Sequence, residues 1–197
     1  QQAMLQHLQS LSGDSALVDA ISTSNRETLV GEAIQGFKRT QRLLHTGEFG
    51  IPAFKPHLIG SLQSYMGYSG YYFPFTGEAH ANLYAPEHTL PYTVAHEMAH
   101  QAGFAMESEA NLVAYLVNRE SSNAFFRYST YYALYQYAFA AHYRMDSIAA
   151  RSIDKGVPNM VKRDRLKMKA FADAHRNPFQ PVLDMVYTQY LQWNRQP

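Results

Sequence analysis

The sequence contains no cysteine, and its positive and negative charges nearly cancel. The absence of cysteine excludes disulfide bonds and thiolate metal ligands, and it fits either side of a membrane. The 17 basic and 16 acidic residues are spread without large blocks of one sign. No basic surface of the kind that binds nucleic acid is therefore expected.

Long apolar runs are missing as well. No run approaches the roughly 20 residues of a membrane-spanning helix, and the first ten residues, QQAMLQHLQS, lack the charged and apolar regions of a signal peptide. This segment is therefore expected to be soluble. Its 197 residues can bury a hydrophobic core without disulfides and fit a single domain, residues 1–197.

The spacing of apolar residues predicts an α+β fold that is predominantly helical. A helix over residues 14–46 dominates a helical N-terminal part, residues 1–50. Residues 55–90, rich in aromatic and turn-forming residues, predict a small sheet of two or three short strands. Residues 92–197 are expected to form a helical C-terminal part, in which Thr93 is the expected N-cap of a helix that ends at Gly103.

Further helices are expected over about 106–118, 122–148, 161–174 and 182–193. Aromatic side chains recur at helical spacing in the second of these and are expected to face the core. They are Phe125, Tyr128, Tyr132, Tyr135, Phe139 and Tyr143.

Residues 96–100 read HEMAH, an HExxH motif. On a helix, His96 and His100 lie on one face, as two ligands of a tetrahedral zinc ion require. Glu97 projects about 100° away around the helix, where it can reach a water molecule in the open coordination position as general base. Two surface histidines beside a glutamate are the alternative, but the surrounding alanines, valine and methionine favour a buried helix.

A third zinc ligand is expected soon after the motif. Gly103 suits a left-handed helix end that turns the chain back toward the metal, and Glu107 follows within reach of that turn. Glu109 is the competing ligand, although it points roughly 200° away from Glu107 on a helix. Asn111, four residues after Glu107, can hydrogen-bond a ligand histidine and fix its ring.

The combination HEMAH…ESEAN resembles the HExxH plus ExxxD signature of gluzincins, with asparagine in place of the usual aspartate. The resemblance implies that His96, His100 and Glu107 bind one Zn²⁺ per chain, that Glu97 activates water, and that Asn111 orients a ligand. The sequence HEMAHQAG also starts like the metzincin pattern, but Met106 stands where that pattern needs histidine.

A longer resemblance is to an uncharacterised bacterial family of membrane-anchored zincin-like proteins. It is carried by SGYYFPFTGEAHAN, LPYTVAHEMAHQAGFAMESEAN and FRYSTYYAL, runs from about Lys55 to the C-terminus, and is weak over the first 50 residues. It implies a zincin-like fold whose small sheet packs on the HExxH helix. It also implies an ectodomain that belongs to a longer protein of the bacterial cell envelope, anchored in the membrane by a segment outside this sequence.

Peptide hydrolysis also needs a donor for the oxyanion and a surface for the substrate. Tyr128, flanked by Arg127 and Ser129, is the predicted donor, with a core tyrosine as the alternative. An extended peptide would pair with an edge strand at Gly77, Glu78 and Ala79. His80 is an optional fourth ligand, but an ordinary exposed histidine is the favoured interpretation for it, as for His142 and His175.

These features predict a zinc metallopeptidase that hydrolyses peptide bonds of a peptide or protein substrate with a zinc-activated water. Glu97 takes a proton from that water and passes it to the leaving amine. The rival hypotheses are a catalytically inactive zinc domain that binds a peptide or an envelope partner, and a helical structural domain whose motif is accidental. An intact glutamate at position 97 favours the enzyme, because a pure binding domain does not need it.

Overall fold

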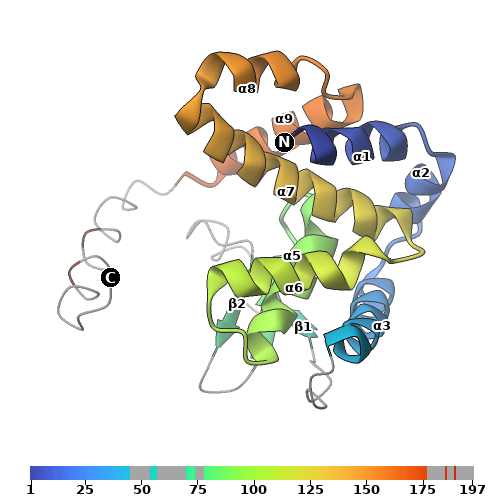
Figure 1. Ribbon diagram of the computed structural model, residues 1–197. Helices are drawn as coiled ribbons and strands as arrows, with labels where there is room; N and C mark the ends of the chain where they lie inside the picture. Colours follow the sequence, from blue (N-terminus) through green and yellow to red (C-terminus); the bar gives the residue numbers. More distant parts are fainter. Residues whose placement is uncertain (45–53, 57–69, 74–77, 177–184, 186–188, 190–197) are drawn as a thin grey trace.

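The computed structural model describes residues 1–44, 54–56, 70–73, 78–176, 185 and 189. This part of the chain is predominantly helical, as predicted (Figure 1). In chain order its elements are α1 (Gln2–Ser12), α2 (Ser15–Ser22), α3 (Arg26–Leu44), β1 (Phe54–Pro56), β2 (Gly70–Phe73), β3 (Glu78–Ala81), η1 (Glu87–Thr89), α5 (Leu90–Gln101), α6 (Glu107–Arg119), α7 (Ala124–Met145), α8 (Ser147–Asp154) and α9 (Asn159–Ala174).

The N-terminal helices differ from the prediction of one continuous helix over residues 14–46. The chain forms α2 and α3 with a break between them, and α1 precedes both. Side-chain caps mark the start of both helices: Asp14, between α1 and α2, accepts a hydrogen bond from the amide of Ala16 at 2.9 Å, and Asn25, at the break between α2 and α3, accepts one from the amide of Thr28 at 2.9 Å. Each cap satisfies an amide that has no partner within the helix, so a new helix begins after it.

The three strands pair in the order β1-β3-β2, with β1 parallel and β2 antiparallel to β3. Ala79 faces Phe54 on one side and Tyr72 on the other, and Glu78 faces Phe73. The predicted substrate strand is therefore wrong, because β3 is the central strand and its two neighbours already occupy its edges. Gly77 lies outside the described residues.

Helix α5 lies at the centre of the fold, beside α3, α6, α7, β2 and β3. Buried side chains from α1, α2, α3, α5, α6, α7 and α9 form one hydrophobic cluster. The predicted aromatic stripe on α7 belongs to this core over its first four positions, Phe125, Tyr128, Tyr132 and Tyr135, which are at most 5% exposed. Phe139 packs against the cluster from its edge, and Tyr143 is 37% exposed near the end of the helix.

Helix α5 begins at Leu90 rather than after Thr93, so the predicted N-cap is wrong. Pro91 stands in the first turn, where a residue without an amide proton is well accommodated. Two buried side chains from other helices hold this turn. Ser129 of α7 accepts from the amide of Tyr92 at 3.0 Å, and Asn118 of α6 donates to the carbonyl of Pro91 at 3.2 Å.

The remaining predicted helices agree with the structure where it can be compared. Helix α6 agrees with the predicted 106–118 to within one residue at each end, α9 covers the predicted 161–174, and the predicted 122–148 is divided into α7 and the start of α8. The helix predicted over 182–193 lies outside the described ranges. Among the helices of the described ranges, none combines the length and the apolar character needed to cross a bilayer.

Candidate metal centre

Three side chains from α5 and α6 converge. The Nε2 atoms of His96 and His100 are 3.1 Å apart, and the Glu107 carboxylate oxygens lie 3.2 Å from His96 Nε2 and 3.5 Å from His100 Nε2. Each residue thus offers one ligand atom within 4.8 Å of the others. Glu109, the competing ligand in the sequence, is exposed and does not belong to this group.

The separations fit a tetrahedral ion. For bonds of about 2.0–2.1 Å, tetrahedral ligand atoms lie about 3.4 Å from one another. The separations found here are close to that value, with a different oxygen of Glu107 nearest to each histidine. The ring of His100 is also oriented for this role, because its Nδ1 lies 2.8 Å from the carbonyl oxygen of Phe104. A proton donated from Nδ1 to that carbonyl leaves the Nε2 lone pair free for a metal.

The turn at Gly103 brings α6 back toward α5. Gly103 has a φ of +102°, in the left-handed region, as predicted for the helix end. The amides of Gly103 and Phe104 donate to the carbonyls of His100 and Ala99 at 3.0 and 3.1 Å, the pattern of a Schellman motif. This single turn places both the carbonyl that orients His100 and the helix that carries Glu107.

Glu97 is buried beside the cluster, with only 6% of its surface exposed. Burial and the negative charge of Glu107 raise the pKa of Glu97 to about 8. A carboxyl group with a pKa near neutrality can both accept and return a proton, which is the property a general base of this kind needs. A positive ion bound between the histidines would lower this pKa.

Asn111 of α6 reaches the first turn of α5. Its Oδ1 accepts a hydrogen bond from the hydroxyl of Tyr92 at 2.7 Å, and its side chain also interacts with His96. Burial and the neighbouring His100 lower the pKa of His96, while Glu107 and Asn111 act in the opposite direction. Asn111 Oδ1 is thus held by Tyr92, and the Nδ1 of His96 has no hydrogen-bond partner within the described residues, so the role of Asn111 in orienting a ligand stays a prediction.

Tyr128 does not join the cluster. It is fully buried, and its hydroxyl donates to Asp164 Oδ2 at 2.6 Å. Asp164 Oδ1 lies 3.8 Å from the buried His88, in a polar group formed with α9 and η1. Burial, and then the hydrogen bond to Asp164, raise the pKa of Tyr128. Tyr128 is thus the core tyrosine that the sequence offered as the alternative.

Two other tyrosines lie near Glu107, and the sequence interpretation missed both. The negative charge of Glu107 adds to burial in raising the pKa of Tyr92 and of Tyr137. The sequence does indicate that Tyr137 faces away from the core. It is two residues beyond Tyr135 and so lies about 200° around α7 from the buried aromatic stripe. Tyr92 carries a simpler signal, because it precedes His96 by one helical turn.

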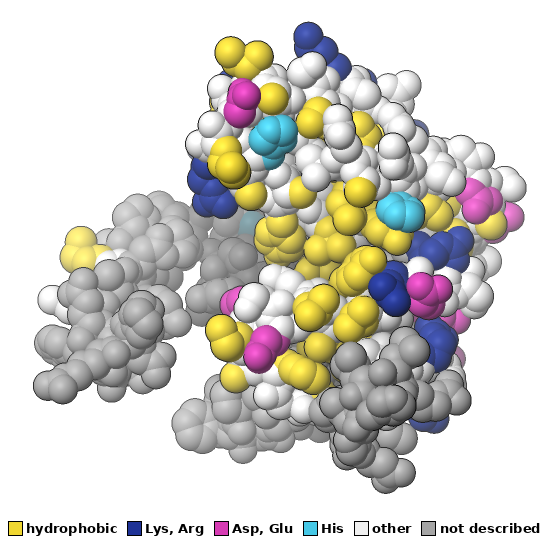
Figure 2. Space-filling model, viewed as in Figure 1, with side chains coloured by type: hydrophobic (Ala, Val, Ile, Leu, Met, Phe, Trp, Pro, Cys, Tyr) yellow, Lys and Arg dark blue, Asp and Glu magenta, His cyan; other side chains and the backbone are white. Residues whose placement is uncertain are grey.

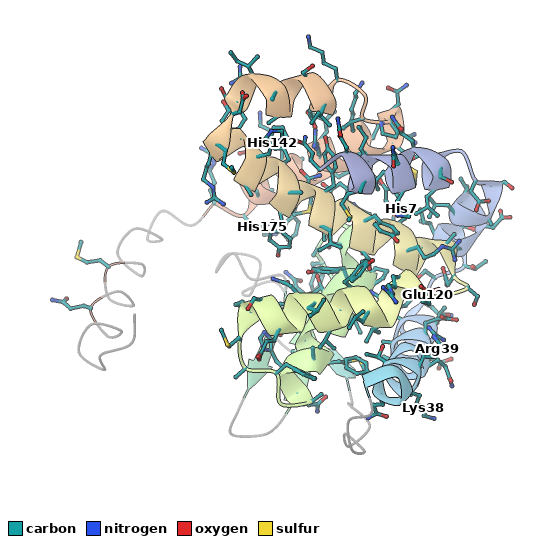
Figure 3. The ribbon with its side chains drawn as sticks, in the orientation of Figure 1. His7, Lys38, Arg39, Glu120, His142 and His175 are labelled. Carbon is teal, nitrogen blue, oxygen red and sulfur yellow. The ribbon has the colours of Figure 1, made fainter. Side chains whose placement is uncertain are left out.

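Three other histidines, labelled in Figure 3, are not members of this group: His7 of α1, His142 of α7 and His175 directly after α9. His142 Nδ1 lies 2.7 Å from Gln1 Oε1, and His175 Nδ1 lies 2.8 Å from the carbonyl of Phe171. His7 stacks on Tyr131 with ring centroids 4.1 Å apart. His80, the optional fourth ligand, is partly buried in β3 and is not a member of the three-residue group.

Comparison with protein families assigns the chain. It belongs to DUF3810, a family described as a protein of unknown function, whose sequence profile matches residues 2–197. The match includes the first 50 residues, where the resemblance was expected to be weak. No curated protein and no solved structure matches the chain.

Proposed function

We propose that this protein is a zinc-dependent metallopeptidase. The observation that carries the proposal is the convergence of His96, His100 and Glu107 at separations that suit one tetrahedral ion. The buried Glu97 lies on the same helix turn as the two histidines, which is the arrangement of a metal-assisted hydrolase. The zincin-like fold predicted from the sequence belongs to the same proposal.

A zinc ion in this site would lower the pKa of a water molecule and polarise the carbonyl of the scissile bond. Glu97 would take the proton from the attacking water and transfer it to the leaving amine. His100 is held for its role by the Phe104 carbonyl, and His96 by its contacts with α6. The negative charge of Glu107 balances part of the charge of the ion.

Apolar side chains near the cluster support a peptide substrate. Met106, directly before Glu107, is 61% exposed. Tyr137, whose pKa is raised by partial burial and by the negative charge of Glu107, is 56% exposed. Further along α6, Leu112 is also 56% exposed. Figure 2 shows hydrophobic side chains gathered where α6 and α7 meet, with charged groups mostly toward the borders of this face. Such surfaces bind the side chains of other polypeptides.

Metal analysis tests the first half of the proposal. The purified protein is expected to hold about one zinc ion per chain, and Glu107→Gln is expected to weaken zinc binding at least about tenfold. Glu109→Gln is the matched control, since both glutamates are exposed in the first turn of α6. Equal loss in the two variants, or a wild type that binds no zinc, would contradict the site.

A peptide library tests the second half. Wild-type protein loaded with zinc is expected to cleave some members, and Glu97→Gln is expected to bind zinc normally while its cleavage rate falls by at least about a hundredfold. If neither protein cleaves although both bind zinc, the hydrolase proposal fails. The catalytically inactive zinc domain that binds a peptide or envelope partner would then replace it.

A further inference from the structure

Tyr92 connects the first turn of α5 to the candidate site. Its hydroxyl donates to Asn111 Oδ1 at 2.7 Å, and its ring centroid lies 6.2 Å from that of His96, with 32° between the ring planes. Its backbone amide is held by Ser129, and only 6% of the residue is exposed. The tyrosine is therefore fixed at both its backbone and its hydroxyl.

The two candidate histidine ligands are supported in different ways. His100 is oriented by a backbone carbonyl, that of Phe104. For His96, the buried Nδ1 has no hydrogen-bond partner within the described residues. The orientation of His96 therefore depends on the side chains packed beside it, which include Tyr92 and Asn111.

An asparagine at position 111 makes the hydroxyl of Tyr92 important. A carboxylate offers only acceptor atoms, whereas an amide offers an acceptor on one end and a donor on the other. An amide that rotates freely would turn either end toward the side chains beside it. The hydrogen bond from Tyr92 to Oδ1 selects one orientation of the amide.

We propose that Tyr92 is a positioning residue of the metal site: its hydroxyl fixes the Asn111 amide, and its ring and that amide together hold His96 in the orientation that binds the ion. This inference rests on the proposed function. It assigns a role to a side chain that does not touch the ion itself.

Binding of Co²⁺, followed by its visible absorption, and competition by Zn²⁺ test the proposal. Tyr92→Phe keeps the ring and removes the hydroxyl, and it is expected to weaken binding of both ions about tenfold, the scale of other outer contacts to metal ligands. Tyr131→Phe is the matched control, since Tyr131 is 7% exposed and stacks on His7 instead. The control is expected to bind both ions as the wild type does.

Two further backgrounds separate positioning from general packing. In Asn111→Ala, adding Tyr92→Phe is expected to weaken binding by less than about twofold, because the two residues act through one hydrogen bond. In Asn111→Asp, both oxygens are acceptors, so Tyr92→Phe is again expected to have a smaller effect. Thermal melting confirms that each variant is folded.

The outcomes are distinct. Wild-type affinity in Tyr92→Phe, or an equal loss in the wild-type and Asn111→Ala backgrounds, overturns this inference alone. A wild type that binds neither ion overturns the proposed function and this inference with it. In the metal-free protein, the side-chain amide NMR signals of Asn111 are expected to shift in Tyr92→Phe and to stay in place in Tyr131→Phe; unchanged signals in both contradict the hydrogen bond itself.

Discussion

The contact between α3 and α6 gives a sharp test of the packing around the site helices. Gly36 of α3 is buried, and a Cβ at this position would lie 2.5 Å from the carbonyl oxygen of Val117 and 2.6 Å from its Cγ1. The carbonyl belongs to the backbone of α6, so a side-chain rotation cannot relieve the clash. Gly31, on the exposed part of the same helix, has no atom within 4 Å of an added Cβ.

The two glycines therefore predict opposite effects of alanine. In an exposed helical position, Gly→Ala is expected to stabilise the protein by up to about 1 kcal/mol. At Gly36 the same gain is opposed by a steric cost of about 3 kcal/mol, the upper end for overpacked cores, because a backbone must move. The net loss of about 2 kcal/mol corresponds to a fall in Tm of about 4–8 °C for a chain of this size.

Urea unfolding and thermal melting of Gly36→Ala, Gly31→Ala and the wild type measure this difference. Gly31→Ala is expected to unfold at the same or a slightly higher urea concentration than the wild type, and Gly36→Ala at a clearly lower one. If Gly36→Ala is as stable as Gly31→Ala, then α3 and α6 do not approach as closely as described.

Three further predictions concern single positions. Burial lowers the pKa of His88 from 6.5 to about 4. Between these two pH values the unfolded chain binds a proton at His88 that the folded chain does not. The free energy of unfolding is therefore expected to fall by at most about 3 kcal/mol as the pH drops from about 6.5 to about 4. Urea unfolding at pH 7 and pH 4.5 should show this loss reduced in His88→Gln, and an unchanged pH dependence would contradict it. Ser129→Ala leaves the buried amide of Tyr92 without its acceptor and is expected to cost about 1–3 kcal/mol, measured in the same way; wild-type stability would argue against the contact. Gly103→Ala places a residue with a side chain in the left-handed conformation, which costs about 1–2 kcal/mol. It is expected to weaken zinc binding in a titration. Zinc affinity equal to that of the wild type would show that this turn does not position the ligands.

The convergence of the candidate ligands could be predicted from the sequence because it depends on short-range geometry. The spacing of His96 and His100 fixes their common face on any helix, and a glycine at position 103 permits the left-handed turn that was found. Glu107 and Asn111 then follow from the same helical spacing on α6. No distant part of the chain needs to be known to bring these side chains together.

The missed features depend on contacts between distant segments. The sequence showed several tyrosines on one helix but not which element each of them would face. Tyr128 was therefore chosen as the oxyanion donor, whereas its hydroxyl in fact donates to Asp164 of α9. The substrate strand was misplaced because a parallel partner, β1, comes from residues 54–56 and covers one edge of β3. The start of α5 was misjudged because Thr93 resembled a cap, while Pro91 and the contacts from α6 and α7 place the first turn earlier.

The turn at Gly103 also determines which motions an ion would suppress. Since all three candidate ligands lie within residues 96–107, an ion would tie together two consecutive helices, and a loop this short loses little chain entropy on closure. Partial openings that separate α5 from α6 would become rarer, so amide hydrogen exchange would slow in residues 90–119. Local unfolding of α1 or α8 does not displace the ion, so amide hydrogen exchange in these helices would be as fast with the ion as without it.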